Sequence, residues 1–462
     1  MLAPAPARLT PPGASPTRFD MDDDVVHALL SVLRGRRSRR FGLGMTMPAG
    51  PLAFASRHAG RRLTEEDEAR LVFAACGITG PALADLSYAK DGGGTIMSGL
   101  VGRTVPSGDG IQTVALVLLN PDGAFYLRRP QDFAPEEIPR LIELATREEY
   151  VELYRRSRVR IADRVETDLE PLGNLACNRW SLFDPAATYV LPVGELTQMY
   201  LNGLLELFGE GTAAYVVDER AGFRPAGLRR FARSRGGHLH DDPRDERVLT
   251  IQQVESLVTE FVTVEQGMML QNVALMAQAL GLGGFPHWAA HPFAWFEALG
   301  FRMERARASR YLGMGPVVAR VARLLGRDAP VPYAVGLERD GVPLLAPYCP
   351  PWHPTMADAV RAVADLKFGR RGIFRGLVTQ GAWREPERIA AAAPETSPAA
   401  IAATIAYGEY VHRRYGRFPA YAPPLRTVLG FQVNHVDVEF YEKHYRPEAL
   451  SETQRARADR VP

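Results

Sequence analysis

The sequence predicts an α+β fold, and three observations indicate it. Helical patterns are long, with one candidate running from about residue 250 to residue 282. Strand patterns are few and short, which is unlike a doubly wound parallel sheet. The composition, 46% hydrophobic and 23% charged residues over 462 positions, is ordinary for a globular protein with a sizeable core.

The first predicted element is a short helix over residues 20–35. Acidic residues suit its N-terminal end, and Val25, Leu29, Leu30 and Leu33 form an apolar stripe at helical spacing. Prolines interrupt the preceding segment where a signal peptide would need continuous apolar residues. We therefore expect residues 1–22 to be a disordered leader.

A second helix is predicted to begin at Thr64 and to end at Gly77, with Asp67 completing a capping box. A glycine-rich loop then leads into a β-branched and leucine run, residues 111–119, that is typical of a buried strand. The turn Asn-Pro-Asp-Gly at 120–123 indicates a hairpin.

The long candidate helix at 250–282 is apolar on nearly every face in its second half, so we expect it to be buried at the centre of the fold. A second hairpin is predicted at 331–347, turning at Asp340-Gly341. An alanine- and proline-rich stretch, 388–400, is expected to be an exposed connector. Further helices are expected at 135–157, 194–208, 355–367 and 399–416.

The charge balance argues against a surface designed for nucleic acid, because the net charge is only +2. The basic residues are almost all arginine, 52 against three lysines. Since such enrichment often reflects the base composition of a genome, a cluster of arginines is weak evidence unless its position and neighbours support it.

The cysteines and the hydropathy pattern favour a cytoplasmic protein. Cys76, Cys177 and Cys349 are far apart and form no CxxC pair, which fits a reducing compartment. Uninterrupted apolar stretches are all shorter than the ~20 residues of a membrane span, so we expect no membrane partner.

Five arginines fall within Arg34–Arg40, directly after the first helix. They could grip nucleic acid, complement the negative end of the helix dipole, or hold one small phosphate. Interleaved aromatic residues, which single-stranded nucleic-acid sites use for stacking, are lacking around the cluster.

Two other segments could contact a ligand. The loop at 103–110 contains Pro106 and small or glycine residues that would let a ligand approach backbone N–H groups, although an ordinary turn has the same composition. Gln271 and Asn272 interrupt the apolar helix, so they either face a polar ring or bond to neighbouring backbone.

Taken in order, these segments resemble the nitroreductase family, which binds FMN. The matching stretches cover roughly residues 25–346 and are RRSRR at 36–40, PSGDG at 106–110, GMMLQNVALMAQALGLGG at 267–284 and PYAVGL at 332–337. The resemblance implies a central, mainly antiparallel sheet within an FMN-binding domain at 23–346. The remaining residues, 347–462, would be an extension that packs on the core or on a dimer partner, as in larger members such as azoline-oxidising peptide dehydrogenases.

The resemblance also implies which residues bind the cofactor. The FMN phosphate would be held by the first motif, in Arg36, Arg37, Ser38 and Arg40, with Arg34 and Arg39 facing solvent. A loop from the other subunit would reach the flavin through Pro106, Ser107 and Asp109, the last at a position where the family more often has asparagine. The flavin ring would lie near Gln271 and Asn272 and against the backbone of Gly283 and Gly284.

The implied function is an FMN-dependent oxidoreductase that uses NAD(P)H and acts as a homodimer with shared active sites on a small-molecule or peptide substrate. The chemistry would take place on the flavin, so no catalytic side chain is required. Alternatives are a flavin-dependent dehydrogenase of a peptide or natural-product intermediate, and a catalytically inactive binding or scaffold protein. Four residues after the glycines would either line the substrate side or pack in the core, namely Phe285, His287, Trp288 and Trp295.

Two histidine clusters have ligand types close together, but we expect no metal site. His238 and His240 lie in a polar, arginine-rich segment that is typical of a solvated loop. The second cluster, near the C-terminus, contains His435, Asp437, Glu439 and His444.

Overall fold

The computed structural model describes residues 18–85, 87, 95–165, 180–181, 184–288, 292–427 and 429–460. Of residues 18–22, 288 and 292–293 only the backbone is described. Residues 1–17 of the expected leader and Cys177 lie outside the described residues. The first helix, α1 (Arg18–Gly35), already includes the last residues of that leader.

The α+β prediction is confirmed, because helices surround a central sheet of seven strands in which every pairing is antiparallel. The strand order is β12-β17-β8-β5-β6-β7, with the short β16 also beside β8. These strands are β5 (Val114–Asn120), β6 (Gly123–Leu127), β7 (Arg158–Ala162), β8 (Thr188–Glu195), β12 (Gly283–Trp288), β16 (Leu425–Arg426) and β17 (Leu429–Asn434).

The middle of the sheet is buried on both faces, since every residue of β5 and β8 is buried. This is why β5 is a continuous apolar run and not an alternating one. The predicted hairpin at 111–127 is confirmed, with Asn120 opposite Gly123 at the turn between β5 and β6.

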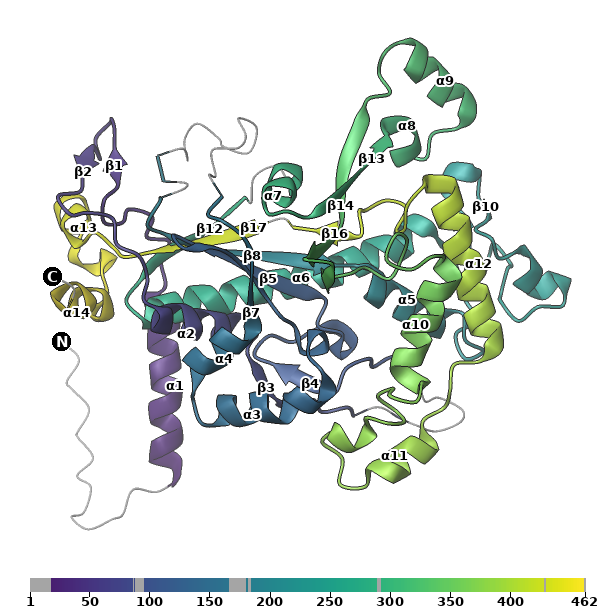
Figure 1. The fold of residues 1–462 in the computed structure, drawn as a ribbon, viewed down its shortest axis with the longest axis horizontal. Coiled ribbons are helices and arrows are strands. Elements are labelled where there is room, and N and C mark those ends of the chain that lie inside the picture. Colours follow the sequence, from purple (N-terminus) through teal and green to yellow (C-terminus); the bar gives the residue numbers. More distant parts are fainter. Residues whose placement is uncertain are drawn as a thin grey trace, which may run out of the picture.

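One face of the sheet is covered by helices, among which α6 (Ile251–Ala279) packs against β8, β12 and β17 and runs along the sheet (Figure 1). The predicted capping box of α2 is confirmed, since Thr64 and Asp67 exchange hydrogen bonds at its start. Helices on this side include α2 (Glu65–Cys76), α3 (Ile138–Thr146), α4 (Tyr150–Ser157) and α5 (Thr197–Leu207).

The prediction that the second half of α6 is buried is only partly correct. Met269, Leu270 and Val273 are buried, but Gly267 and Gln271 are exposed. The helix therefore shows one face to solvent along its length.

The C-terminal part of the chain contributes an interior strand to the sheet, because β17 lies between β12 and β8. The helices α13 (Val438–His444) and α14 (Glu452–Arg460) lie near α1, while α10 (Met356–Phe368) and α12 (Pro398–Tyr415) lie at the opposite end (Figure 1). The expected connector at 388–400 is wrong in part. A helix, α11 (Pro386–Ala392), starts at Pro386, and Ala393 after it is buried.

An arm projects from the other face of the sheet (Figure 1). Two long strands, β13 (Arg302–Arg307) and β14 (Pro330–Arg339), carry the short helices α8 (Ala308–Tyr311) and α9 (Pro316–Leu324) at the tip. The predicted hairpin is confirmed, since β14 turns into β15 (Val342–Leu345) at Asp340 and Gly341, both with positive φ.

The smaller elements connect these parts, and α7 (Pro292–Ala298) packs beside the arm. No described helix is both long enough and apolar enough to cross a membrane. The remaining strands are β1 (Thr46–Met47), β2 (Phe54–Ala55), β3 (Ile78–Pro81), β4 (Val101–Arg103), β9 (Tyr215–Asp218), β10 (Arg224–Pro225) and β11 (Val248–Thr250).

Candidate functional site

The arginine cluster lies where the end of α1 meets the sheet. After α1 the chain forms antiparallel bridges, Arg39 with Gly284 in β12 and Gly42 with Val436 just beyond β17. Two segments that are far apart in the sequence, the arginine motif and the double glycine, are therefore side by side within one chain.

Arg39 is the buried member of the cluster, so the expectation that it faces solvent is wrong. Its Nε donates to the Ala449 carbonyl at 2.7 Å, and its Nη1 donates to Gln278 Oε1 at 2.9 Å. Burial lowers the pKa of Arg39 to about 10. Arg39 therefore joins α1, α6 and the C-terminal segment, whereas Arg34 is exposed as expected.

The other residues of the motif are more exposed than Arg39. Arg37 and Ser38 are exposed, and Arg40 is partly buried with its guanidinium 4.9 Å from the centre of the Phe285 ring. Arg37, Ser38 and Arg40 line a cavity of about 480 Å³, a volume in the range of small-molecule sites. Arg36 is partly buried and does not line this cavity.

Aromatic residues form much of the remaining wall of this cavity, which we call the arginine cavity. Phe41 stacks on Phe440 of α13 with ring centres 4.1 Å apart, and Trp180 stacks on Phe41 with ring centres 6.2 Å apart. Tyr441 and Tyr445 complete the wall. Sequence reasoning missed these residues, although the aromatic spacing of the C-terminal FYEKHY segment was a usable signal.

The two glycines are needed by the packing of the chain itself. A Cβ on Gly283 would lie 2.8 Å from the Arg39 carbonyl oxygen, and one on Gly284 would lie 2.8 Å from the carbonyl oxygen of Gln432. Any side chain there would push β12 away from its neighbours. The double glycine is thus explained without a ligand.

The loop at 106–110 is held by a buried ion pair. Arg103 Nη2 lies 2.9 Å from Glu265 Oε1 on α6, and both side chains are almost fully buried. The Ser107 hydroxyl donates to Glu265 Oε2 at 2.7 Å and accepts from the Gln112 N–H. The hydroxyl proton of Ser107 is therefore already used within the chain, while Pro106 is exposed.

Asp109 occupies the left-handed region with φ 56° and accepts a hydrogen bond from Asn202 Nδ2 at 3.2 Å. Burial raises the pKa of the Asp109 carboxyl to about 6. A protonated carboxyl can donate a hydrogen bond as an asparagine amide does. The buried ion pair of Lys367 and Glu206, at 2.8 Å, lies close to this carboxyl.

The two amides of α6 differ from expectation. Asn272 is partly buried and donates to the Thr104 carbonyl at 3.2 Å, so it is satisfied by backbone. Gln271 was expected to be buried and is exposed.

The arginine motif and the loop at 106–110 contact α6 at different places. Arg39 binds Gln278, whereas Ser107 binds Glu265, thirteen residues earlier on the helix. At 1.5 Å per residue the two contacts are about 20 Å apart. Within one chain, the motif and the loop therefore do not form a single site.

Of the four residues that follow the double glycine, Phe285, His287 and Trp295 are buried, which agrees with core packing. The side chain of Trp288 lies outside the described residues.

Among the residues that the structure describes, no group of three or more His, Cys, Asp or Glu side chains could hold a metal. His238 Nε2 lies 2.9 Å from the Phe208 carbonyl, and His240 lies beside Asp245. His435 is buried, and burial lowers its pKa to about 4. Asp437 caps α13 by accepting from the Phe440 N–H.

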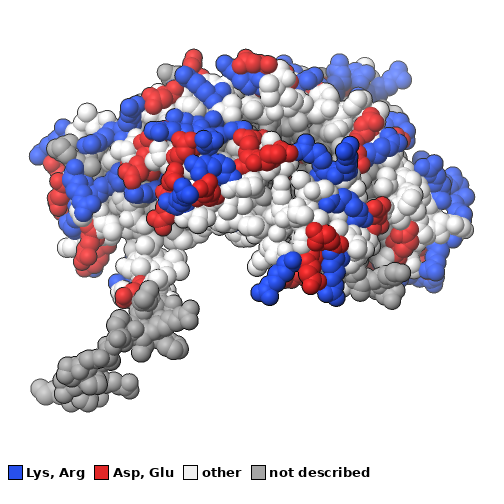
Figure 2. Space-filling model, turned by 60° about the horizontal axis from the view of Figure 1, so that its bottom comes forward, with Lys and Arg blue, Asp and Glu red and all other residues white. Residues whose placement is uncertain are grey.

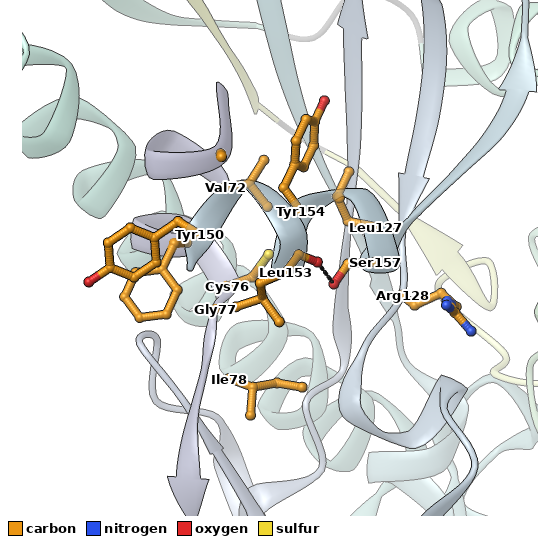
Figure 3. Close-up of a pocket in the computed structure, with 12 residues that line it drawn as sticks. Val72, Cys76, Gly77, Ile78, Leu127, Arg128, Tyr150, Leu153, Tyr154 and Ser157 are labelled. Carbon is orange, nitrogen blue, oxygen red and sulfur yellow. Dashed lines mark hydrogen bonds between the residues drawn. The ribbon is translucent and has the colours of Figure 1, made fainter. Parts of the chain in front are cut away.

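A second, smaller cavity lies beside Cys76 between α2 and α4 (Figure 3). Its volume of about 20 Å³ is enough for one water molecule. Burial raises the pKa of the Cys76 thiol to about 11, so the reactive thiolate is not formed near neutral pH. This cavity is a packing defect of the core and not a candidate site.

No protein-family model and no curated protein matches the chain. One solved structure it resembles is a protein from Ralstonia eutropha JMP134, provisionally designated a nitroreductase, at 2.00 Å resolution. The two share 13% identity with a TM-score of 0.29, over 64% of this chain and 79% of that one. A likeness at this TM-score carries no argument about fold or function.

Proposed function

We propose that the protein is an FMN-dependent oxidoreductase that transfers hydride or electrons between NAD(P)H and an organic acceptor. The observation that carries this proposal is the arginine cavity, in which Arg37, Ser38 and Arg40 face a wall of aromatic residues. FMN combines a phosphate with a planar ring, which are the two chemical groups that such a lining binds.

The donors in the cavity fit a phosphate. Two guanidinium groups and a hydroxyl can donate to its oxygens, and none of the described residues that line the cavity is acidic. Arg37 Nη1 also donates to the Arg34 and Arg36 carbonyls at 2.8 Å, which fixes the side chain and leaves its other N–H groups to bind a ligand.

When bound, FMN would supply the exchange of hydride and electrons. The chain would hold the phosphate with Arg37, Ser38 and Arg40, and Phe41 and Trp180 would keep water from that end of the cofactor. The buried Arg39 would keep these three residues in position, because it joins the motif to α6. The free thiols of Cys76 and Cys349 fit a reducing cytoplasm.

We further propose that the protein is a homodimer and that α6 forms its interface. Leu257, Phe261 and Val264 are about half exposed, at 52%, 50% and 56%. The stripe continues with the same alternating spacing of four and three residues through Met268 and Gln271. Apolar residues at this spacing form the seam of paired helices, and Gly267 leaves open space for a close approach.

A two-fold axis at Gln271, the last residue of this stripe, would complete the site. Gln271 lies midway between Glu265, which holds the loop at 106–110, and Gln278, which holds Arg39. Two α6 helices that cross antiparallel at Gln271 place the loop of one subunit at the level of the arginine cavity of the other. Asp109 and Pro106 would then reach the cofactor of the partner.

The projecting α1 supports the same interface. Its stripe of Val26, Leu29, Leu30 and Leu33 is exposed, and Figure 2 shows the described part of the helix as a mostly uncharged surface. Because the C-terminal end of α1 lies beside the C-terminal end of α6, with Gly35 next to Gln278, the apolar face of α1 can pack on the exposed half of α6 in the partner.

Binding of FMN tests the cofactor directly. The purified chain, stripped of any flavin, is titrated with FMN while flavin fluorescence is followed. We expect saturable binding that Arg37→Ala with Arg40→Ala weakens at least about 100-fold, and that the control Arg34→Ala leaves unchanged. Equal affinities of the double variant and the natural chain would place the phosphate elsewhere.

Reduction of the bound flavin tests the activity. Under anaerobic conditions NADH or NADPH should bleach the flavin absorbance, and the faster donor identifies the co-substrate. A chain that binds FMN but is bleached by neither nucleotide would not be the proposed oxidoreductase.

A further inference from the structure

The helix α9 at the tip of the arm contains no buried residue. Its large apolar side chains are exposed, and their exposed fractions are 75% for Val317, 56% for Val318, 48% for Val321, 80% for Leu324 and 63% for Leu325. Soluble proteins seldom leave a contiguous apolar patch without a role.

These side chains share one face of α9. At 100° per residue they span an arc of about 120°, as wide as the stripe that packs a helix against another element. Ala319 and Ala322 are only partly buried and lie on a different side. The small residues of the helix thus face the other residues of the arm, and its valines and leucines face solvent.

The tip also carries positive charge without acidic residues. Residues 305–327 contain six arginines and no aspartate or glutamate. Arg320 lies next to the apolar face and Arg323 lies farther round the helix, and both are exposed. The next acidic residue, Asp328, is buried; it accepts from the Ser309 N–H at 2.8 Å, and its Oδ2 lies 3.6 Å from Arg323 Nε.

The tip is held in place by contacts that leave this face open. Arg220 Nη1 donates to the Leu312 carbonyl at 2.7 Å, and Gly313 packs against the ring of Tyr415. These contacts join the tip to two other parts of the chain. The apolar face is therefore presented by a fixed support.

We propose that α9 is a docking surface for a partner polypeptide that presents an apolar helix or strand flanked by aspartate or glutamate. Apolar contacts would form the centre, and the flanking carboxylates would pair with Arg320 and with the outer N–H groups of Arg323, whose Nε faces Asp328. A second copy of the chain is disfavoured as the occupant. The helix α1, which belongs to the proposed dimer interface, lies on the opposite side of the molecule from α9 (Figure 1). A membrane surface is disfavoured because residues 312–327 lack the aromatic anchors of interfacial helices.

The test uses the full chain and a fluorescent designed helical peptide with leucine on one face and glutamate elsewhere. Fluorescence anisotropy should show binding that Val321→Asp with Leu324→Asp weakens at least about tenfold. Arg320→Glu with Arg323→Glu should weaken it similarly and should strengthen binding of a peptide in which lysine replaces glutamate. The control Phe223→Asp alters an apolar residue that is 67% exposed elsewhere and should change nothing.

Three results would overturn the proposal. The first is equal affinity of the peptide for the natural chain and both double variants, or no binding at all. The second is sedimentation of the chain with vesicles of equimolar phosphatidylglycerol and phosphatidylcholine, lost in the same variants, which would identify a lipid surface. The third is a change of oligomeric mass in Val321→Asp with Leu324→Asp, which would identify a second copy.

Discussion

Arg103 and the arginines of the motif at 36–40 lie near α6 and use the same side chain differently. Arg103 is 9% exposed, and its guanidinium bonds to Gln112, the Val114 carbonyl and Glu265. Of Arg36–Arg40, only Arg39 is buried in this way, and Arg37 and Arg40 border an open cavity. Arg103 is satisfied inside the chain, whereas Arg37 has N–H groups that can bind a ligand in the cavity.

This difference shows that neighbouring arginines can have different roles, in stability or in ligand binding, according to their burial. A buried guanidinium must find all its partners in the protein, because an unpaired buried charge is costly. An exposed one carries no such requirement and can be kept for binding. Loss of the first kind should therefore change stability, and loss of the second kind should change ligand affinity.

The largest expected effect is on the buried pair. Glu265→Gln or Arg103→Met should lower the free energy of unfolding by about 3–5 kcal/mol, because each leaves the partner charge buried and unpaired. Urea denaturation measures the change. The exposed pair of Arg140 and Glu143 is the matched control, and Arg140→Ala should cost less than about 1 kcal/mol.

The next effect concerns the seam of α6. Phe261→Asp should raise the dissociation constant of the dimer at least about 30-fold, because it places a charge within an apolar interface. Light scattering across a dilution series measures the mass. A natural chain that is monomeric at all concentrations, or a variant that stays dimeric, would remove α6 from the interface.

An intermediate effect separates Arg39 from its neighbours. Arg39→Ala should lower the free energy of unfolding by about 2 kcal/mol, because it removes hydrogen bonds to the Ala449 carbonyl and to Gln278. Arg37→Ala should leave stability within about 0.5 kcal/mol, since its side chain is exposed. Thermal unfolding of the two variants makes the comparison, and equal losses would contradict it.

The smallest effect is the pH dependence due to Asp109. Its pKa is about 6 in the folded chain, above the usual value of 3.8, so unfolding releases a proton between these pH values. Stability from this group is therefore complete below pH 3.8 and is lost as the pH rises through 6. Asp109→Asn should be more stable than the natural chain at pH 8 by about 1 kcal/mol, with little difference at pH 4.

Urea denaturation at the two pH values measures this difference. A natural chain and an Asp109→Asn variant with parallel pH profiles would show that the carboxyl titrates normally. Asn202→Ala serves as the control, because it removes the amide that donates to Asp109 and should raise the pKa of the carboxyl further.

Much of the local structure could be predicted from the sequence, because short-range chemistry determines it. The capping box at Thr64, the turn at 120–123 and the hairpin at Asp340 each depend on a few adjacent residues. The position of β17 could not be predicted in this way. Its pairing with β12 and β8 joins segments more than 100 residues apart, and no local signal records such a pairing.

In the candidate site, too, local features could be predicted from the sequence and long-range contacts could not. The motif at 36–40 and the double glycine could be recognised from the sequence, and their role in binding a cofactor stays a prediction. Which arginine is buried depends on Gln278 and Ala449, which approach from distant segments. The aromatic wall was missed for the same reason, since Phe41, Trp180 and Tyr441 meet only in the folded chain.

The most direct test of the central claim is a native mass spectrum of the purified protein. The account predicts a species of two chains with two FMN molecules, which loses both FMN molecules in Arg37→Ala with Arg40→Ala while the two chains stay together. A spectrum in which the natural chain carries no flavin, even after incubation with FMN, would contradict the account.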